Sequence, residues 1–345
     1  MKFVTLGDLR IWLNRLTLEN EYTLVAPCDV DGHVLYRPIA SGDEVLLDYQ
    51  RPELSPKDCL LPATEVMLQI EKRGDEVVQK ELLSDRTQVL FGVRPCDAHG
   101  FAVMDALFLG QDPPDLYYRH HRERTVLVGL ACPQMWEACF CTSLGGAPDD
   151  PTHLDLLLRE VDGGYAVEVV TERGSALLDG LTVQEWEGEL PPPVTRAETV
   201  PILSPQEWRS LFEEERIWKR HGERCLSCRL CAYVCPTCRC FDVTDRVVEE
   251  RAGVTRIERI RVWDACTSTN YRRAAGGHNP RPTKPGRLRN RFYCKFCYYP
   301  EDFGPVGCVG CGRCIVSCPV DVDIGEVLRD VAEATLPPAC GGTFR

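Results

Sequence analysis

The stretch CLSCRLCAYVCP, residues 225–236, places four cysteines and a proline at the spacing C-x2-C-x2-C-x3-C-P. The stretch CVGCGRCIVSCP, residues 308–319, repeats that spacing. Runs of this kind hold cubane [4Fe–4S] clusters, and the fourth cysteine of each run ligates the cluster of the other run. The chain is therefore predicted to carry two [4Fe–4S] clusters in its C-terminal part.

Each predicted ligand set combines three cysteines of one run with the last cysteine of the other. Three thiolates on one tight loop can wrap a cluster, and the fourth closes the fold from a distant segment. The first cluster is assigned to Cys225, Cys228, Cys231 and Cys318, and the second to Cys308, Cys311, Cys314 and Cys235. A single C-x2-C pair would also suit tetrahedral zinc, but two complete runs that each end in Cys-Pro favour iron and sulfide.

Length and composition describe an ordinary globular protein. The chain has 345 residues, which predicts two domains that each bury a core. No apolar run approaches the roughly eighteen residues that a membrane helix needs, and the first residues lack a signal-peptide design, so no membrane insertion is expected. Because many of the 20 cysteines are needed as thiolates, a reducing, cytoplasmic location is expected.

Charge is distributed unevenly along the chain. The whole chain has a formal net charge of −12, whereas residues 251–295 contain twelve Lys and Arg against only Glu258 and Asp264. A basic segment in an acidic protein raises the question of nucleic-acid binding. Because this segment lies between the two cysteine runs, we expect its charge to offset anionic clusters or to receive an acidic partner or a phosphate-bearing cofactor, and we expect no nucleic-acid partner.

The predicted fold is an α/β N-terminal domain, residues 1–195, followed by a helical two-cluster ferredoxin domain, residues 204–345. The boundary lies near Pro191-Pro192-Pro193, in a polar, extended stretch. Ser204 and Glu207 predict a capping box around Pro205, at the start of one helix that carries Trp208 and Trp218. The 72 residues between Cys235 and Cys308 exceed what a compact two-hairpin ferredoxin could accommodate, which favours the helical form.

The N-terminal domain shows both helical and strand patterns. Leu6, Leu9, Trp12, Leu13 and Leu16 recur at helical spacing. Short strands are predicted at Tyr22–Val25, His33–Tyr36, Glu44–Leu47, Thr87–Val93, Thr125–Leu130 and Tyr165–Val170.

Four more cysteines suggest a third cluster in this domain. Cys96 follows the strand Thr87–Val93, Cys132 follows the strand Thr125–Leu130, and a helix is predicted between them. In a β-α-β unit the two strands are parallel, so both cysteines emerge at one sheet edge, where Cys139 and Cys141 can join them. A third [4Fe–4S] site is predicted. The alternatives are structural zinc or buried thiols that serve only as small apolar side chains.

The roles of five other cysteines stay open at this point. Cys238, Cys240 and Cys266 can hold another site or contact a redox centre, but burial beside the clusters is the favoured interpretation. Cys294 and Cys297 form a C-x2-C pair, which alone is weak evidence for a metal. Cys28, Cys59 and Cys340 follow no pattern and are interpreted as packing or incidental thiols.

A string of motifs along the chain resembles one family of iron–sulfur electron-transfer proteins. This family is typified by the iron–sulfur electron-transfer component of anaerobic sulfite reductase and by the beta subunit of cytosolic NiFe hydrogenases (sulfhydrogenases). The matching stretches are residues 55–57, 61–65, 92–97, 139–143, 235–238, 275–279, 287–291 and 308–314. One departure is Cys294, because the resemblance implies a histidine before Lys295-Phe296.

The resemblance implies a relay of single electrons. Its partners would be an NAD(P)H-oxidising flavoprotein subunit and a terminal enzyme, either a hydrogenase or a sulfite reductase. Such a subunit would not be catalytic alone, and no catalytic residue is assigned. The alternative is a self-contained iron–sulfur oxidoreductase with its own substrate site, which predicts turnover by the isolated chain.

Overall fold

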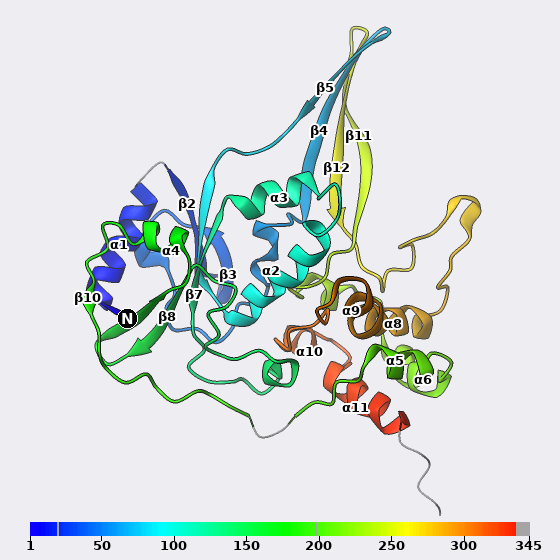
Figure 1. Ribbon diagram of the computed structural model, residues 1–345. Coiled ribbons are helices and arrows are strands. Elements are labelled where there is room, and N and C mark those ends of the chain that lie inside the picture. The colour runs from blue at the N-terminus through cyan, green and yellow to red at the C-terminus, as the bar shows by residue number, and fades with distance from the viewer. Residues whose placement is uncertain (19–20, 197–198, 336–345) are drawn as a thin grey trace, which may run out of the picture.

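The computed structural model describes residues 1–18, 21–196 and 199–335. Its N-terminal part is built around an eight-stranded mixed sheet with the order β10-β1-β9-β8-β7-β6-β2-β3 (Figure 1). The strands of this sheet are β1 (Lys2–Thr5), β2 (Tyr22–Val30), β3 (His33–Pro38), β6 (Thr87–Val93), β7 (Thr125–Leu130), β8 (Leu156–Val161), β9 (Gly164–Val169) and β10 (Gln184–Glu185).

The centre of this sheet is parallel. Strand β6 pairs in parallel with β2 and β7, and β7 pairs in parallel with β8. The connection from β6 to β7 contains α2 (Pro95–Phe108) and α3 (Leu116–Glu123). The predicted β-α-β unit is therefore confirmed, with both strands at the predicted bounds and a second helix in the crossover.

Both faces of the parallel strands are buried. Val89, Phe91 and Val126 face one core with Leu9 and Trp12 of α1 (Leu6–Leu18). The alternate residues of β6 and β7, Leu90 and Leu127 among them, face a second core with residues of α2 and α3. A strand covered on both sides has to be apolar throughout, which is why β6 and β7 read as unbroken hydrophobic runs. Helix α4 (Glu172–Leu177) adds Leu177 to the first core.

The strand predicted at Glu44–Leu47 is wrong. Residues Gly42–Glu44 form a 3-10 turn, η1, which is capped by the Ser41 side chain. The Leu46 N–H donates to the Pro27 carbonyl of β2 at 2.8 Å, but this contact does not extend into a strand ladder. The alternating apolar residues that predicted a strand are instead a short loop in which Val45 packs into the first core.

A second, four-stranded antiparallel sheet projects from the molecule as an arm (Figure 1). Its order is β11-β12-β4-β5, and its strands are β4 (Thr64–Arg73), β5 (Glu76–Glu81), β11 (Phe241–Arg251) and β12 (Val254–Trp263). Strands from the two halves of the sequence meet here, with Ile257 opposite Ile70. No strand was predicted in residues 64–81 or 241–263, because the arm is largely exposed and shows weak apolar alternation.

The arm changes the interpretation of the basic segment. Arg256 donates to Glu71 and Glu249, and Arg259 donates to Asp245, so these cations pair with acids on neighbouring strands. Buried Arg261 donates to Glu65 at 2.6 Å and to Asp115 at 2.9 Å. Part of the positive charge is therefore neutralised within the arm, and only part of it lies near the cysteine runs.

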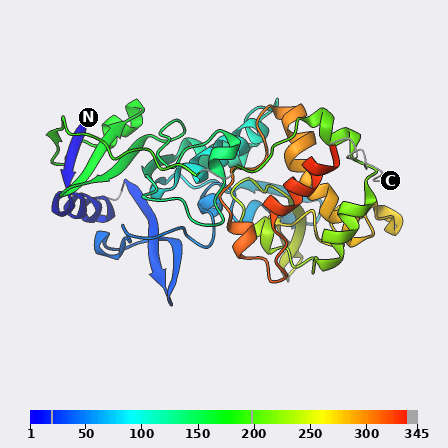
Figure 2. The same cartoon turned by 90° about the horizontal axis from the view of Figure 1, so that it is seen from below.

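The C-terminal part packs short helices around both cysteine runs (Figures 1 and 2). These helices are α5 (Pro205–Ser210), α6 (Glu215–Arg224), α7 (Leu230–Tyr233), α8 (Lys284–Tyr293), α9 (Tyr299–Phe303), α10 (Arg313–Val316) and α11 (Ile324–Thr335), with a 3-10 turn η4 (Ala275–Gly277) and a π-turn η5 (Cys294–Tyr298). The capping box of Ser204 and Glu207 is confirmed. The single helix predicted there is two helices, although Trp208 and Trp218 still share one core. Within the described residues no helix combines the length and apolarity needed to cross a membrane.

Candidate iron–sulfur centres

The structure brings the first predicted ligand set together around one small cavity. Cys225, Cys228, Cys231 and Cys318 all line it. Backbone N–H groups already point at two of these sulfurs, from Ser227 to Cys225 Sγ at 3.4 Å and from Val322 to Cys318 Sγ at 3.2 Å. Such donors are typical around cluster sulfurs, where they stabilise negative charge.

The second predicted ligand set is more deeply buried than the first. Cys235, Cys308 and Cys311 are buried, and Cys314 is half-buried. Burial raises the pKa of Cys308 to about 11, with Lys295 acting against it and the Cys235 and Cys311 sulfurs adding to it. These thiols therefore lie within electrostatic reach of one another. Metal binding requires thiolates, so a metal held here would remove the protons that burial retains.

A buried lysine contacts a cysteine of the second ligand set. Lys295 is 3% exposed, and its Nζ donates to the Gly307 carbonyl at 2.6 Å, to Thr237 Oγ1 at 2.8 Å and to Cys235 Sγ at 3.4 Å. Burial alone would lower the pKa of Lys295, but the sulfurs of Cys235 and Cys238 outweigh it, and its pKa lies above the ordinary value. Lys295 is therefore a fixed positive charge beside a predicted ligand.

The four N-terminal cysteines also converge. Cys96 lies in the first turn of α2, Cys132 follows β7, and Cys139 and Cys141 lie in the loop before β8, which contains the 3-10 turn η3 (Cys141–Leu144). All four line one small cavity together with Arg51 and Arg94. Arg94 is buried, and its Nη1 donates to the carbonyls of Leu130 and Ala131 just before Cys132. These thiols therefore lie together at one edge of the parallel sheet, as predicted from the β-α-β unit.

The N-terminal set adjoins the second run directly. Cys311 and Gly310 line the same cavity as the four N-terminal cysteines. Arg51 Nη1 donates to the Cys311 carbonyl at 2.6 Å, and the Phe140 N–H donates to the Gly310 carbonyl at 2.8 Å. Gly310 has φ +64°, and a Cβ there would lie 2.5 Å from the Cys141 nitrogen. Only glycine permits this close approach of the two loops.

A fully buried ion pair also joins the N-terminal set to the second cysteine run. Arg313, between Cys311 and Cys314, donates through both terminal nitrogens to Asp97, at 2.6 and 2.7 Å. Asp97 directly follows Cys96. Arg313 Nε also donates to the Pro52 carbonyl at 2.9 Å. A fully buried pair of this kind needs good geometry and further hydrogen bonds, and here the bidentate contact and the Pro52 carbonyl engage all three nitrogens of the guanidinium.

The first and second sets also adjoin. Cys314 and Arg291 line the cavity of the first set. Arg291 is 4% exposed, and it donates to the Cys231 carbonyl at 2.9 Å and to Cys238 Sγ at 3.4 Å. Burial would lower the pKa of Arg291, but the surrounding cysteine sulfurs raise it well above the usual value. The three thiol sets therefore stand in a row, with the second set in the middle.

The remaining cysteines divide into three groups. Cys238, Cys240 and Cys266 lie beside the second set, where the Cys266 thiol hydrogen bond, acting against burial, lowers the pKa of Cys240 to about 5. Cys294 and Cys297 point to different partners, since Cys294 Sγ accepts from Arg239 Nη2 at 3.4 Å and Cys297 Sγ contacts the Pro205 carbonyl at 3.6 Å. Buried Cys28 and half-buried Cys59 lie in the N-terminal part, and Cys340 lies outside the described residues.

The buried cations of the site were not singled out from the sequence. Lys57 is a further case, because its Nζ donates to the Ala232 carbonyl at 2.8 Å and to the Cys238 carbonyl at 3.1 Å. Lysine and arginine are almost never fully buried without partners, so sequence alone suggests an exposed position. Only the general expectation that positive charge would offset the clusters anticipated this arrangement.

Comparison with known proteins supports the same assignment. The 4Fe-4S dicluster domain family matches residues 224–322, which include both runs. Sulfhydrogenase 2 subunit beta of Pyrococcus furiosus is 34% identical over 314 residues, covering 87% of this chain and 90% of the relative. The chain belongs to the family of hydrogenase beta-type iron–sulfur subunits. No solved structure matches it significantly.

A hydrogenase beta-type subunit with a dicluster domain binds [4Fe–4S] clusters and transfers electrons. The donor chemistry of the site fits, because thiolates are the ligands of such clusters and buried cations here offset their negative charge. The predicted α/β N-terminal part followed by a ferredoxin-like 4Fe-4S domain is confirmed at this level.

Proposed function

We propose that this hydrogenase beta-type subunit relays single electrons from an NAD(P)H-oxidising flavoprotein subunit to a terminal redox enzyme. We infer that the terminal enzyme is a cytosolic NiFe hydrogenase or a sulfite reductase, and the name of the relative, a sulfhydrogenase subunit, favours a hydrogenase. Iron–sulfur clusters are one-electron carriers, whereas nicotinamide exchanges electron pairs, so a flavin in the partner would split the pair.

Three ligand sets are proposed, one for each cavity or cluster of thiols. The chain would hold the first cluster through Cys225, Cys228, Cys231 and Cys318, the second through Cys308, Cys311, Cys314 and Cys235, and the third through Cys96, Cys132, Cys139 and Cys141. The observation that carries the proposal is their contiguity, since Cys311 also lines the N-terminal cavity and Cys314 also lines the first. A row of this kind suits conduction rather than catalysis at one isolated centre.

The row has one end at the surface. Cys228 is exposed, and the neighbouring Leu226 and Leu230 are 55% and 41% exposed. Large apolar side chains beside a redox ligand provide a surface on which a partner subunit can dock closely. We therefore infer that electrons enter or leave through the loop of the first set.

We also propose two structural units. Residues 1–195 would form the α/β domain with the third site, and residues 204–345 a helical dicluster ferredoxin domain. The helices that flank and lie within both runs support this division. The arm strands β11 and β12 are the exception, because they leave the helical part and pair with β4 of the N-terminal part.

The relay is tested on the native complex, purified anaerobically through a tag on this chain. NADH or NADPH should bleach the cluster absorbance of the complex, but not that of the isolated, cluster-loaded chain. The Cys231→Ser variant should still assemble and should fail to pass electrons to the terminal enzyme. Reduction of the isolated chain by NAD(P)H would instead support the self-contained oxidoreductase.

A further inference from the structure

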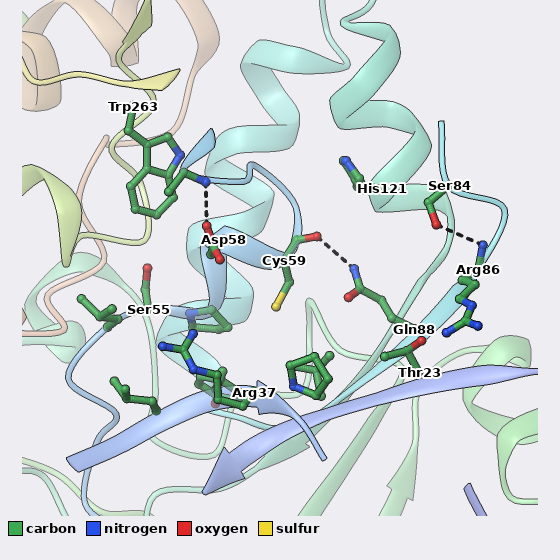
Figure 3. A pocket seen from close by; sticks show the side chains of 17 residues that line it. Thr23, Arg37, Ser55, Asp58, Cys59, Ser84, Arg86, Gln88, His121 and Trp263 are labelled. Carbon is green, nitrogen blue, oxygen red and sulfur yellow. Dashed lines mark hydrogen bonds between the residues drawn. The ribbon is translucent and has the colours of Figure 1, made fainter. Parts of the chain in front are cut away.

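We propose that a cavity outside the row of thiols binds a small organic anion, a molecule with an apolar body and one carboxylate or phosphate group. The cavity has a volume of about 450 Å³ and lies between the β2–β3 hairpin and the segment that contains η2 (Pro56–Cys59). Small-ligand sites typically have volumes of about 300–1,000 Å³. None of the twelve proposed cluster ligands lines this cavity (Figure 3).

Two arginines supply the positive charge. Arg37 and Arg86 both line the cavity, and within the described residues neither guanidinium has a hydrogen-bond or ion-pair partner. Figure 3 shows them on different sides of the pocket. Among the described residues that line the cavity Asp58 is the only carboxylate, and one of its oxygens already accepts the Ala63 N–H at 2.6 Å. Two unpaired guanidiniums against one engaged carboxylate favour an anion.

A buried hydroxyl gives independent evidence for a ligand. Ser55 is 4% exposed, lines the cavity, and its Oγ has no hydrogen-bond partner. Ser55 stands at the N-cap of η2 but does not cap it through its side chain. Buried polar groups are nearly always satisfied, so an unpartnered hydroxyl on a residue that lines the cavity supports the presence of a ligand there. A carboxylate or phosphate oxygen would accept this hydrogen.

The walls suit an apolar body. Trp263, Pro56, Pro38 and Leu35 line the cavity, and Leu54 at its edge is 43% exposed. Trp263 is held in place, because its Nε1 donates to the Leu61 carbonyl at 2.9 Å and Lys57 Nζ lies 4.1 Å from its ring centroid. A rigid apolar wall beside unpaired cations is the arrangement of a preformed small-molecule site.

The chemistry of the cavity points to binding rather than covalent catalysis. Cys59 is the one thiol in the described part of the cavity lining, and burial raises its pKa to about 12. A thiol that stays protonated is a poor nucleophile. His121 also lines the cavity, but its Nε2 is paired with Glu65 at 2.7 Å. The site therefore offers recognition groups and no activated nucleophile.

The test is isothermal titration calorimetry of the full, cluster-loaded chain under anaerobic conditions. The probes are phenyl phosphate and benzoate, which distinguish the two anionic groups, and benzyl alcohol as the neutral analogue. One molecule of at least one anion should bind per chain, and benzyl alcohol should bind at least about tenfold more weakly, since hydrogen bonds to charged groups are the stronger ones.

The variants locate the binding. The double variant Arg37→Gln/Arg86→Gln should weaken the anion by about tenfold or more, and Ser55→Ala should weaken it less without lowering stability. Arg119→Gln is the matched control, because Arg119 is an exposed arginine outside the cavity. Cluster absorbance confirms folding of each variant. The proposal is overturned if neither anion binds, if benzyl alcohol binds equally well, or if the double variant binds like Arg119→Gln.

Discussion

The N-terminal and C-terminal parts of the chain both bring cysteines together, but they do so in different ways. In the C-terminal part, residues 225–236 and 308–319 place three cysteines each on one tight loop, so the ligands are close in sequence and in space. In the N-terminal part, Cys96, Cys132, Cys139 and Cys141 are scattered, and parallel strands β6 and β7 bring them to one edge. If the proposed third set holds a cluster, a cluster site can be encoded by sheet topology as well as by local spacing. A site encoded by sheet topology depends on the whole fold.

The largest expected effect concerns ligands in the local runs. Replacing Cys231 or Cys311 with Ser should remove about four iron atoms per chain, the content of one [4Fe–4S] cluster, and stop electron transfer through the complex. Iron analysis and electron paramagnetic resonance of the reduced protein measure both losses. Cys297→Ala is the matched control, because Cys297 contacts a carbonyl outside the three sets. Equal iron in the Cys231→Ser variant and the wild type would refute the assignment.

The next effect tests the junction between the two regions. Arg313→Met leaves Asp97 as a buried, unpaired charge and should cost roughly 3–5 kcal/mol of stability, whereas the double variant Asp97→Leu/Arg313→Met should lose much less. Urea-induced unfolding under anaerobic conditions measures the difference. If both variants were as stable as the wild type, the ion pair would not hold the N-terminal set against the second run.

Much of the fold and of the candidate site could be predicted from the sequence. The features that could not be predicted depend on contacts between distant segments of the chain. The runs and their ligand sets follow from spacing alone, and strands Thr87–Val93 and Thr125–Leu130 follow from unbroken apolar stretches. The arm was missed because its strands are exposed and pair across the sequence, as Ile70 does with Ile257. Buried Lys295 and Arg313 were missed as site residues because their burial depends on partners from distant segments.

A glycine substitution should separate the two kinds of site. Gly310→Ala would place a Cβ 2.5 Å from the Cys141 nitrogen, so it should push the N-terminal loop away from the second run. Gly253→Ala is the control, since Gly253 also has positive φ (+75°) but has nothing within 4 Å. Gly253→Ala should cost only about 1–2 kcal/mol from its backbone conformation. Gly310→Ala should in addition lose iron from the N-terminal set first, and equal iron contents in both variants would contradict the close junction.

The smallest expected effect concerns electrostatic tuning within the second set. Removing the positive charge in Lys295→Met should make reduction of the nearest cluster harder and lower its midpoint potential by about 60 mV, which corresponds to ~1.4 kcal/mol for a one-electron couple. Redox titration followed by electron paramagnetic resonance gives the value. Lys219→Met removes an exposed lysine and should leave all potentials unchanged. A Lys295→Met potential that stays at the wild-type value would show that Lys295 is only structural.

The central claim is that scattered cysteines form a third site equivalent to the two encoded by local runs. Iron and acid-labile sulfide per chain, measured after anaerobic purification, test it most directly. Three clusters predict about twelve iron atoms and about twelve sulfides per chain, falling to about eight of each in Cys132→Ser. About eight iron atoms in the wild type, unchanged in Cys132→Ser, would contradict the claim and leave the N-terminal thiols as packing residues or a zinc site.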